Sequence, residues 1–135
     1  FDKMNVVGIG IHSVDVKRIE RAYKESGKAF LSRIFTAKEL EHASVKTNKK
    51  VFFTHIAGKF AAKEAVKKAL PDGADIGFAW CDIEILNDEQ GKPYVKLHGA
   101  AAKVMKKFKL AQVLVSIAHT DEIAVSNAVV TKNGN

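Results

Sequence analysis

Apolar residues recur at spacings of three and four from Lys50 to Leu70, and this period predicts one long amphipathic helix. Pro71 cannot continue a helix, so we expect the helix to end there and the chain to turn at Asp72–Gly73. The expected apolar face consists of Phe53, Ile56, Ala57 and Phe60.

Short apolar runs bounded by turn residues predict strands at Val6–Ile11, Cys81–Leu86, Pro93–Leu97, Val113–His119 and Ile123–Val130. Shorter helical periods predict helices at about Asp15–Lys24, Phe30–Phe35 and Gly99–Phe108. Because these elements occur in mixed blocks with two hairpin-like pairs, we expect the α+β class, with a mostly antiparallel sheet packed on the long helix. The length of the chain fits one domain over residues 1–135.

Three local signals refine these elements. Gly8 and Gly10 predict that the first strand runs into a tight turn, and close packing of the backbone explains them better than a phosphate loop. Thr36 with Glu39 three residues later has the pattern of a capping box. Gly58 in mid-helix indicates a close approach by backbone or ligand.

The chain carries a formal charge of +7 and has an estimated pI of 9.5, which favours acidic partners without choosing between nucleic acid, phosphorylated ligands, membrane and protein. No apolar run approaches the roughly 20 residues of a membrane-spanning helix. Cys81, the only cysteine, fits a small buried apolar role in a reducing compartment. We therefore expect a cytoplasmic protein, or an organellar one if a targeting segment was removed, since the chain does not begin with Met.

Glu64 is unusual because it continues the apolar face of the long helix four residues after Phe60. A carboxylate there must be paired, protonated or bound to a cation, because burying a bare charge is costly. Helix spacing alone favours a salt bridge to Lys68. A basic stripe also runs beside Glu64, which a phosphorylated ligand or solvent would stabilise; it consists of Lys59, Lys63 and Lys67.

Two histidines stand at strand ends. By alternation His119 shares a face with Ile117 and Val115, so we expect its imidazole to border the core. A structural role is the commoner one for such a residue. His12 follows the two glycines, where a strand end would present it toward a site.

Four blocks in order along the chain resemble the holo-acyl-carrier-protein synthases, the small bacterial-type 4′-phosphopantetheinyl transferases. The blocks are Gly8–Gly10 with Val14–Ile19, Phe60–Ala69, Asp82–Glu84 with Gly91–Pro93, and Val115–Thr120. The resemblance runs from about Asn5 to Val130 and implies the fold of that family. It also implies transfer of 4′-phosphopantetheine from coenzyme A to a serine of apo acyl carrier protein, releasing 3′,5′-ADP, for fatty acid biosynthesis.

The resemblance assigns residue roles. It implies that Glu64 holds Mg²⁺ and is the candidate base, and that Lys68 neutralises phosphate charge. It implies that His119 orients the phosphates near the metal, as a catalytic and a coenzyme-binding residue. The other coenzyme-binding residues that it implies are Lys59, Gly91, Lys92 and Pro93.

His12 departs from the family pattern, because the matching position carries the Asp that is the second metal ligand. Imidazole is a poor ligand for Mg²⁺ and a better one for Mn²⁺ or another divalent ion. Three outcomes are open: a site held by Glu64 and substrate phosphates with weaker Mg²⁺ binding, a changed metal preference, or lost activity. We favour the first.

The resemblance also implies a homotrimer, and it implies that Arg18, Phe30 and Arg33 meet an acidic helix of acyl carrier protein. It leads us to expect neither nucleic acid nor membrane as a partner. Two alternatives stay open: a catalytically impaired homologue that binds coenzyme A or carrier protein, and a basic nucleic-acid-binding module. The aromatic residues oppose the latter, since they fall on a helix row.

Overall fold

The computed structural model describes residues 3–44, 48–71 and 77–134. The turn expected at Asp72–Gly73 lies outside these residues. In chain order the elements are β1 (Met4–Asp15), α1 (Val16–Ile34), α2 (Ala37–Ser44), α3 (Lys49–Ala69), the 3₁₀ turn η2 (Trp80–Asp82), β2 (Ile83–Asn87), β3 (Pro93–Leu97), α4 (Gly99–Lys107), β4 (Leu110–His119) and β5 (Ile123–Asn133). The α+β class is confirmed. None of the described helices is long and apolar enough to cross a membrane.

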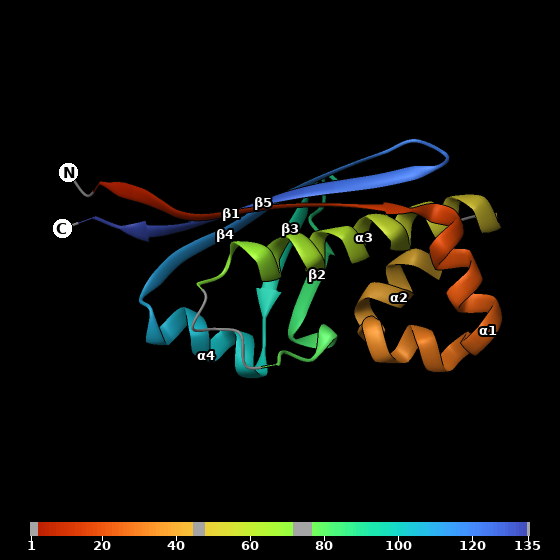
Figure 1. The fold of residues 1–135 in the computed structure, drawn as a ribbon, viewed down its shortest axis with the longest axis horizontal. Helices are drawn as coiled ribbons and strands as arrows, with labels where there is room; N and C mark the ends of the chain where they lie inside the picture. Colours follow the sequence, from red (N-terminus) through yellow and green to blue (C-terminus); the bar gives the residue numbers. More distant parts are fainter. Residues whose placement is uncertain (1–2, 45–47, 72–76, 135) are drawn as a thin grey trace.

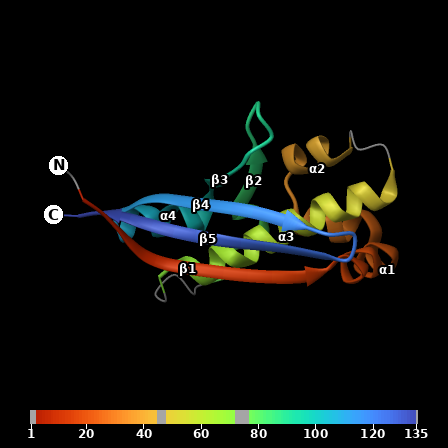
Figure 2. The same ribbon diagram turned by 90° about the horizontal axis from the view of Figure 1, so that it is seen from above.

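The strands form two antiparallel sheets. A long sheet has the order β1-β5-β4, and β2 pairs with β3 in a separate hairpin. Helix α3 lies along one face of the long sheet, with α1 and α2 beside one end of it (Figure 1). The β2–β3 hairpin extends on the β4 side of the sheet (Figure 2). This arrangement places β1 and β4 at opposite edges of one sheet, with α3 beneath them.

The first strand differs from its prediction, because it continues through both glycines to Asp15 and does not turn after Ile11. Pairing with β5 over its length keeps it extended. A Cβ added at Gly8 would lie 1.8 Å from the carbonyl oxygen of Ala69, and one at Gly10 would lie 2.1 Å from that of Ala65. The two glycines therefore let the backbone of α3 pack directly on β1, as the alternative of close packing predicted.

Gly58 also permits a close contact, at the other edge of the sheet. A Cβ there would lie 2.8 Å from Cγ2 of Ile117 in β4. A close approach at this glycine does occur, but a side chain makes it and not the backbone or ligand that was predicted.

The two short helices predicted between residues 15 and 35 are joined in α1. Gly27, with φ of 53°, interrupts the helical geometry inside it. The first half buries Val16 and Ile19, and the second buries Phe30 and Ile34. The kink lets both halves turn apolar side chains toward the N-terminal part of α3.

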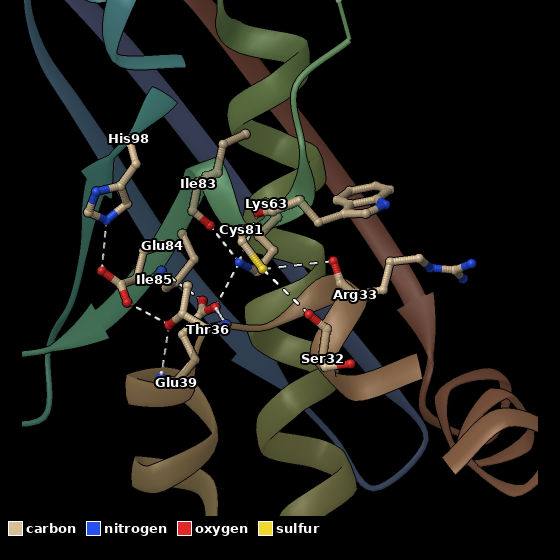
Figure 3. A network of polar contacts seen from close by, with 11 residues as sticks. Ser32, Arg33, Thr36, Glu39, Lys63, Cys81, Ile83, Glu84, Ile85 and His98 are labelled. Atoms are coloured by element: carbon tan, nitrogen blue, oxygen red, sulfur yellow. Dashed lines mark hydrogen bonds and ion pairs between the residues drawn. The ribbon is translucent and has the colours of Figure 1, made fainter. Parts of the chain in front are cut away.

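Lys63 was predicted in a basic stripe but is buried, and this prediction was wrong. Its Nζ donates to Glu39 Oε1 at 2.8 Å and to the carbonyl oxygens of Trp80 and Ile83 at 3.2 and 2.5 Å (Figure 3). Burial lowers the pKa of Lys63, and the carboxylate of Glu39 acts against that shift. Three acceptors around the Lys63 ammonium and donors to both Glu39 oxygens offset the cost of burying this pair.

Glu39 completes the network. Its Oε2 accepts from the backbone nitrogen of Ile85 at 2.8 Å, and its Oε1 accepts from that of Thr36 at 2.8 Å. Thr36 Oγ1 accepts in turn from the backbone nitrogen of Glu39, so the predicted capping box is confirmed. Thr36 also donates to Glu84, whose other oxygen lies 3.0 Å from His98 Nε2 (Figure 3). Helices α2 and α3 and strand β2 are thereby tied at one point.

The Lys63→Met variant tests this tie. Removing the ammonium leaves the buried carboxylate of Glu39 without its cation, so we expect a loss of about 3–5 kcal/mol in the free energy of unfolding. Urea denaturation at pH 7 measures this loss. Lys103→Met, at an exposed position of α4, is the matched control and should change stability by less than about 0.5 kcal/mol. Equal stabilities of the two variants would contradict the assigned role.

Candidate active site

The first group of predicted site residues gathers where α3 meets β1. Lys68 Nζ donates to the carbonyl oxygen of Ile11 at 3.0 Å and lies 3.2 Å from His12 Nδ1. His12 reaches α3 because it alternates with Gly8 and Gly10 on the inner face of β1. Lys68 thus turns to the strand, and among the described side chains no ion pair joins it to Glu64. The salt bridge that helix spacing favoured is absent.

Three charged side chains influence the pKa of His12. Burial lowers the pKa of its imidazole; Glu64 opposes that shift, while Lys68 and Arg18 add to it. These effects identify Glu64 and Arg18 as neighbours of the histidine. Glu64 is half-buried, so its carboxylate borders the core and also meets solvent. We call His12, Arg18, Glu64 and Lys68 the carboxylate cluster.

Two aromatic side chains, Phe60 and Trp80, lie beside this cluster. The Phe60 ring packs edge-on at 6.3 Å from that of His12, and Trp80 lies 5.3 Å from Phe60. Lys67 Nζ lies 4.7 Å above the Trp80 ring. Sequence reasoning missed Trp80 as a neighbour of the site, although its being the only tryptophan was an available signal.

The second group lines a cavity of about 430 Å³ at the β4 edge of the sheet. Four of the five residues predicted to bind coenzyme are among its walls, namely Lys59, Gly91, Pro93 and His119. Lys92 is exposed on the adjacent turn and is not part of the lining. His55, which sequence reasoning did not single out, also lines the cavity; its place one turn before Lys59 was the available signal.

His119 differs from its prediction, because it is exposed and does not border the core. Ile117, two residues earlier, is the last residue of β4 to pack against Gly58 of α3. Beyond that contact the His119 side chain joins the wall of the cavity, whose other walls include Thr54 and His55 of α3.

Within one copy of the chain, the residues around His12 and the residues of the cavity lie apart. Lys59 and Glu64 lie five residues apart on α3 and so differ by about 140° around its axis. Strand β5 separates His12 on β1 from His119 on β4, and His119 also lies two residues further along the sheet, which puts these residues about 12 Å apart. Within one copy of the chain, His119 therefore lies away from the cluster that contains Glu64.

Among the residues predicted to meet carrier protein, Arg18 and Arg33 are exposed at the two ends of α1. Phe30 is only 7% exposed and packs in the core, because the Gly27 kink turns it inward. The ring of Phe30 therefore supports α1 and offers little surface to a partner.

Cys81 is half-buried, and its Sγ lies 3.8 Å from the carbonyl oxygens of Ser32 and Arg33. Burial raises the pKa of this thiol. A protonated thiol facing backbone carbonyls agrees with the small packing residue predicted.

Comparisons with known proteins decide the family. The sequence model of the 4′-phosphopantetheinyl transferase superfamily matches residues 8–126. A holo-[acyl-carrier-protein] synthase of Protochlamydia amoebophila is 42% identical over 123 residues, which cover 91% of this chain and 96% of that protein. The chain belongs to the 4′-phosphopantetheinyl transferase superfamily. The resemblance stated from the sequence is confirmed.

Solved structures agree. The holo-ACP synthase of Plasmodium yoelii superposes with a TM-score of 0.79 at 29% identity, covering 98% of this chain and 99% of that one. A holo-(acyl-carrier-protein) synthase of Bacillus anthracis, in complex with CoA (3′,5′-ADP), superposes with a TM-score of 0.75 at 32% identity, covering 96% and 99%. The predicted phosphopantetheinyl transferase fold is confirmed.

The donor atoms fit a magnesium ion only in part. Glu64 offers the oxygen ligand that Mg²⁺ prefers, whereas His12 offers nitrogen. Within the parts of the chain that the structure describes, no three His, Cys, Asp or Glu side chains gather into a group that could hold a metal. A hard cation at Glu64 would therefore depend on oxygen atoms from a ligand or from water.

Proposed function

We propose that this chain transfers the 4′-phosphopantetheine group of coenzyme A to a serine of apo acyl carrier protein, releasing 3′,5′-ADP, for fatty acid biosynthesis. The observation that carries the proposal is the cavity whose walls bring together Lys59, Gly91, Pro93 and His119. Its volume lies within the range of about 300–1,000 Å³ that small-molecule sites occupy. The relative from Bacillus anthracis holds CoA (3′,5′-ADP) on the same fold.

Each group has a role in this reaction. Lys59 and His119 bind phosphate oxygens of the coenzyme, and Gly91 and Pro93 lie along its nucleotide. The serine oxygen attacks the β-phosphorus, which carries the pantetheine arm, and the bridging P–O bond breaks toward 3′,5′-ADP. Glu64 accepts the serine proton, and Lys68 neutralises charge on the transferred phosphoryl group.

Mg²⁺ is the proposed cofactor, with Mn²⁺ or another divalent ion as the alternative because of His12. Glu64 is the residue that would hold it together with the coenzyme phosphates. A bound ion would supply positive charge to the diphosphate.

We also propose that the enzyme is a homotrimer in which the carboxylate cluster of one copy faces the cavity of the next. The separation of the two groups within one chain supports this arrangement. So does the face of the long sheet opposite α3, which no other described helix or strand covers in Figure 2 and on which apolar side chains are exposed. Ile9 is 73% exposed and Ile11 is 64% exposed, and Leu114 across the sheet is 50% exposed. A patch of this kind is typical of a protein interface.

Acyl carrier protein is the proposed second substrate. Arg18 and Arg33 offer positive charge at the two ends of α1, and Arg18 belongs to the carboxylate cluster. The net charge of +7 would attract an acidic protein over long range, and the attraction would weaken as salt rises.

The Glu64→Gln variant tests the proposed chemistry. Gln keeps the shape of the side chain but can neither hold a cation well nor accept a proton, so we expect transfer to fall at least about 100-fold. Mass spectrometry of apo carrier protein, incubated with coenzyme A and Mg²⁺ or Mn²⁺, measures the adduct. Glu122→Gln, at an exposed position of the β4–β5 turn, is the control and should keep its rate. Near-normal turnover by Glu64→Gln, with thermal unfolding unchanged, would refute the assignment.

Mixing two inactive variants tests the shared site. Glu64→Gln spoils the carboxylate cluster, and His119→Ala spoils the cavity. If each site takes one group from each of two neighbouring copies, random exchange between the variants should restore activity in about a quarter of the sites.

The control for this experiment mixes Glu64→Gln with the double variant Glu64→Gln/His119→Ala, in which every site lacks the carboxylate. That mixture should stay inactive. A 1:1 mixture of the two single variants that stays equally inactive, after mass spectrometry has shown that subunits exchanged, would rule out a site shared between copies.

A further inference from the structure

The contact between His12 and Lys68 fixes which atom carries the imidazole proton. An ammonium group has three hydrogens to donate and no lone pair to accept with. Lys68 Nζ lies 3.2 Å from Nδ1 of His12, so Nδ1 must be the acceptor and the proton of the neutral ring must be on Nε2. The contact thus determines the tautomer.

This arrangement removes His12 from the set of metal ligands. Its Nδ1 lone pair is used by Lys68, and a protonated Nε2 has no lone pair in the ring plane to offer. The edge-on packing of Phe60 at 6.3 Å fills one side of the ring. Glu64 is then the one protein ligand that the cluster offers to a hard cation.

The same contact gives His12 another task, which concerns Lys68. The ammonium is held by two acceptors from consecutive residues of β1, the carbonyl oxygen of Ile11 at 3.0 Å and the imidazole of His12. Lys68 is otherwise an exposed side chain on the last turn of α3, and four rotatable bonds would let it spread through solvent. The two contacts fix a positive charge next to Glu64.

We propose, building on the function proposed above, that His12 is a positioning residue and not a metal ligand: it holds the Lys68 ammonium where the diphosphate of the coenzyme binds. The fixed ammonium supplies positive charge at the place where the family pattern has an Asp that binds the ion. Coenzyme binding should then persist when divalent ions are removed.

The first experiment needs no ligand. Long-range ¹H–¹⁵N spectra of the imidazoles at neutral pH should show His12 with a proton on Nε2 and none on Nδ1. In Lys68→Met the Nδ1 resonance of His12 should shift toward that of a free acceptor, while His119, on the other edge of the sheet, should not move. A proton on Nδ1 of His12 in the unmodified protein would overturn the inference.

The second experiment measures coenzyme A affinity by calorimetry in EDTA and in Mg²⁺. His12→Asn keeps an acceptor oxygen near the place of Nδ1, and His12→Leu removes it. We expect His12→Asn to bind in EDTA within about twofold of the unmodified protein, and His12→Leu to bind about tenfold more weakly. His12→Asp adds an oxygen ligand, so Mg²⁺ should raise its affinity more than that of the unmodified chain.

The outcomes separate the two proposals. If the unmodified protein binds no coenzyme A under any condition, the proposed function fails, while the imidazole spectra still decide the tautomer. If it binds but His12→Asn is as weak as His12→Leu, or if Mn²⁺ bound to the protein shows coupling to imidazole nitrogen in pulsed EPR that disappears in His12→Asn, then His12 is a ligand and the inference is wrong.

Discussion

The direct contact between the backbones of α3 and β1 is the constraint on which this structure depends. Gly8 and Gly10 leave no Cβ between strand and helix, so carbonyl oxygens of α3 lie where side chains would otherwise stand. Any larger residue at either position would push the helix away from the strand. Lys68 and Glu64 lie on that part of the helix. The lack of a side chain at Gly8 and Gly10 therefore sets how closely they approach His12.

The far side of α3 is held in a different way. Lys63 and Glu39 form a buried ion pair that joins the helix to α2 and β2. Each of the two side chains also forms a hydrogen bond to the backbone of β2. Strand β2 leads into the turn that carries Gly91 and then into β3, which begins at Pro93, so this network also positions a wall of the cavity. A hydrophobic replacement of similar volume would pack the helices but would leave the nitrogen of Ile85 without its acceptor.

The sequence predicted more of the fold than of the site. Helical period, capping residues and alternation located nearly every element, because each of these signals is local. The signals failed where a tertiary contact overrode them: β5 kept β1 extended through its glycines, and Glu39 drew Lys63 into the core. His119 was misplaced because alternation gives the face of a strand but not whether that face is packed or opens onto a cavity. Glu64 was singled out by its place on the apolar face of the helix, but the roles of Glu64 and Lys68 came from the family resemblance, and their spacing alone favoured an ion pair that does not form.

The position of Lys68 bears on how a site with a single carboxylate manages a diphosphate. Two negative phosphates need opposing positive charge, which can come from an ion brought by the ligand or from an ammonium already in place. A mobile lysine loses conformational entropy when it binds, whereas one held by Ile11 and His12 has lost it on folding. The imidazole serves this purpose because it is neutral: a carboxylate at the same place would hold the ammonium more tightly but would also compensate its charge. A neutral acceptor leaves the full positive charge of Lys68 available to the phosphates, and the histidine in β1 is therefore consistent with binding a phosphorylated ligand.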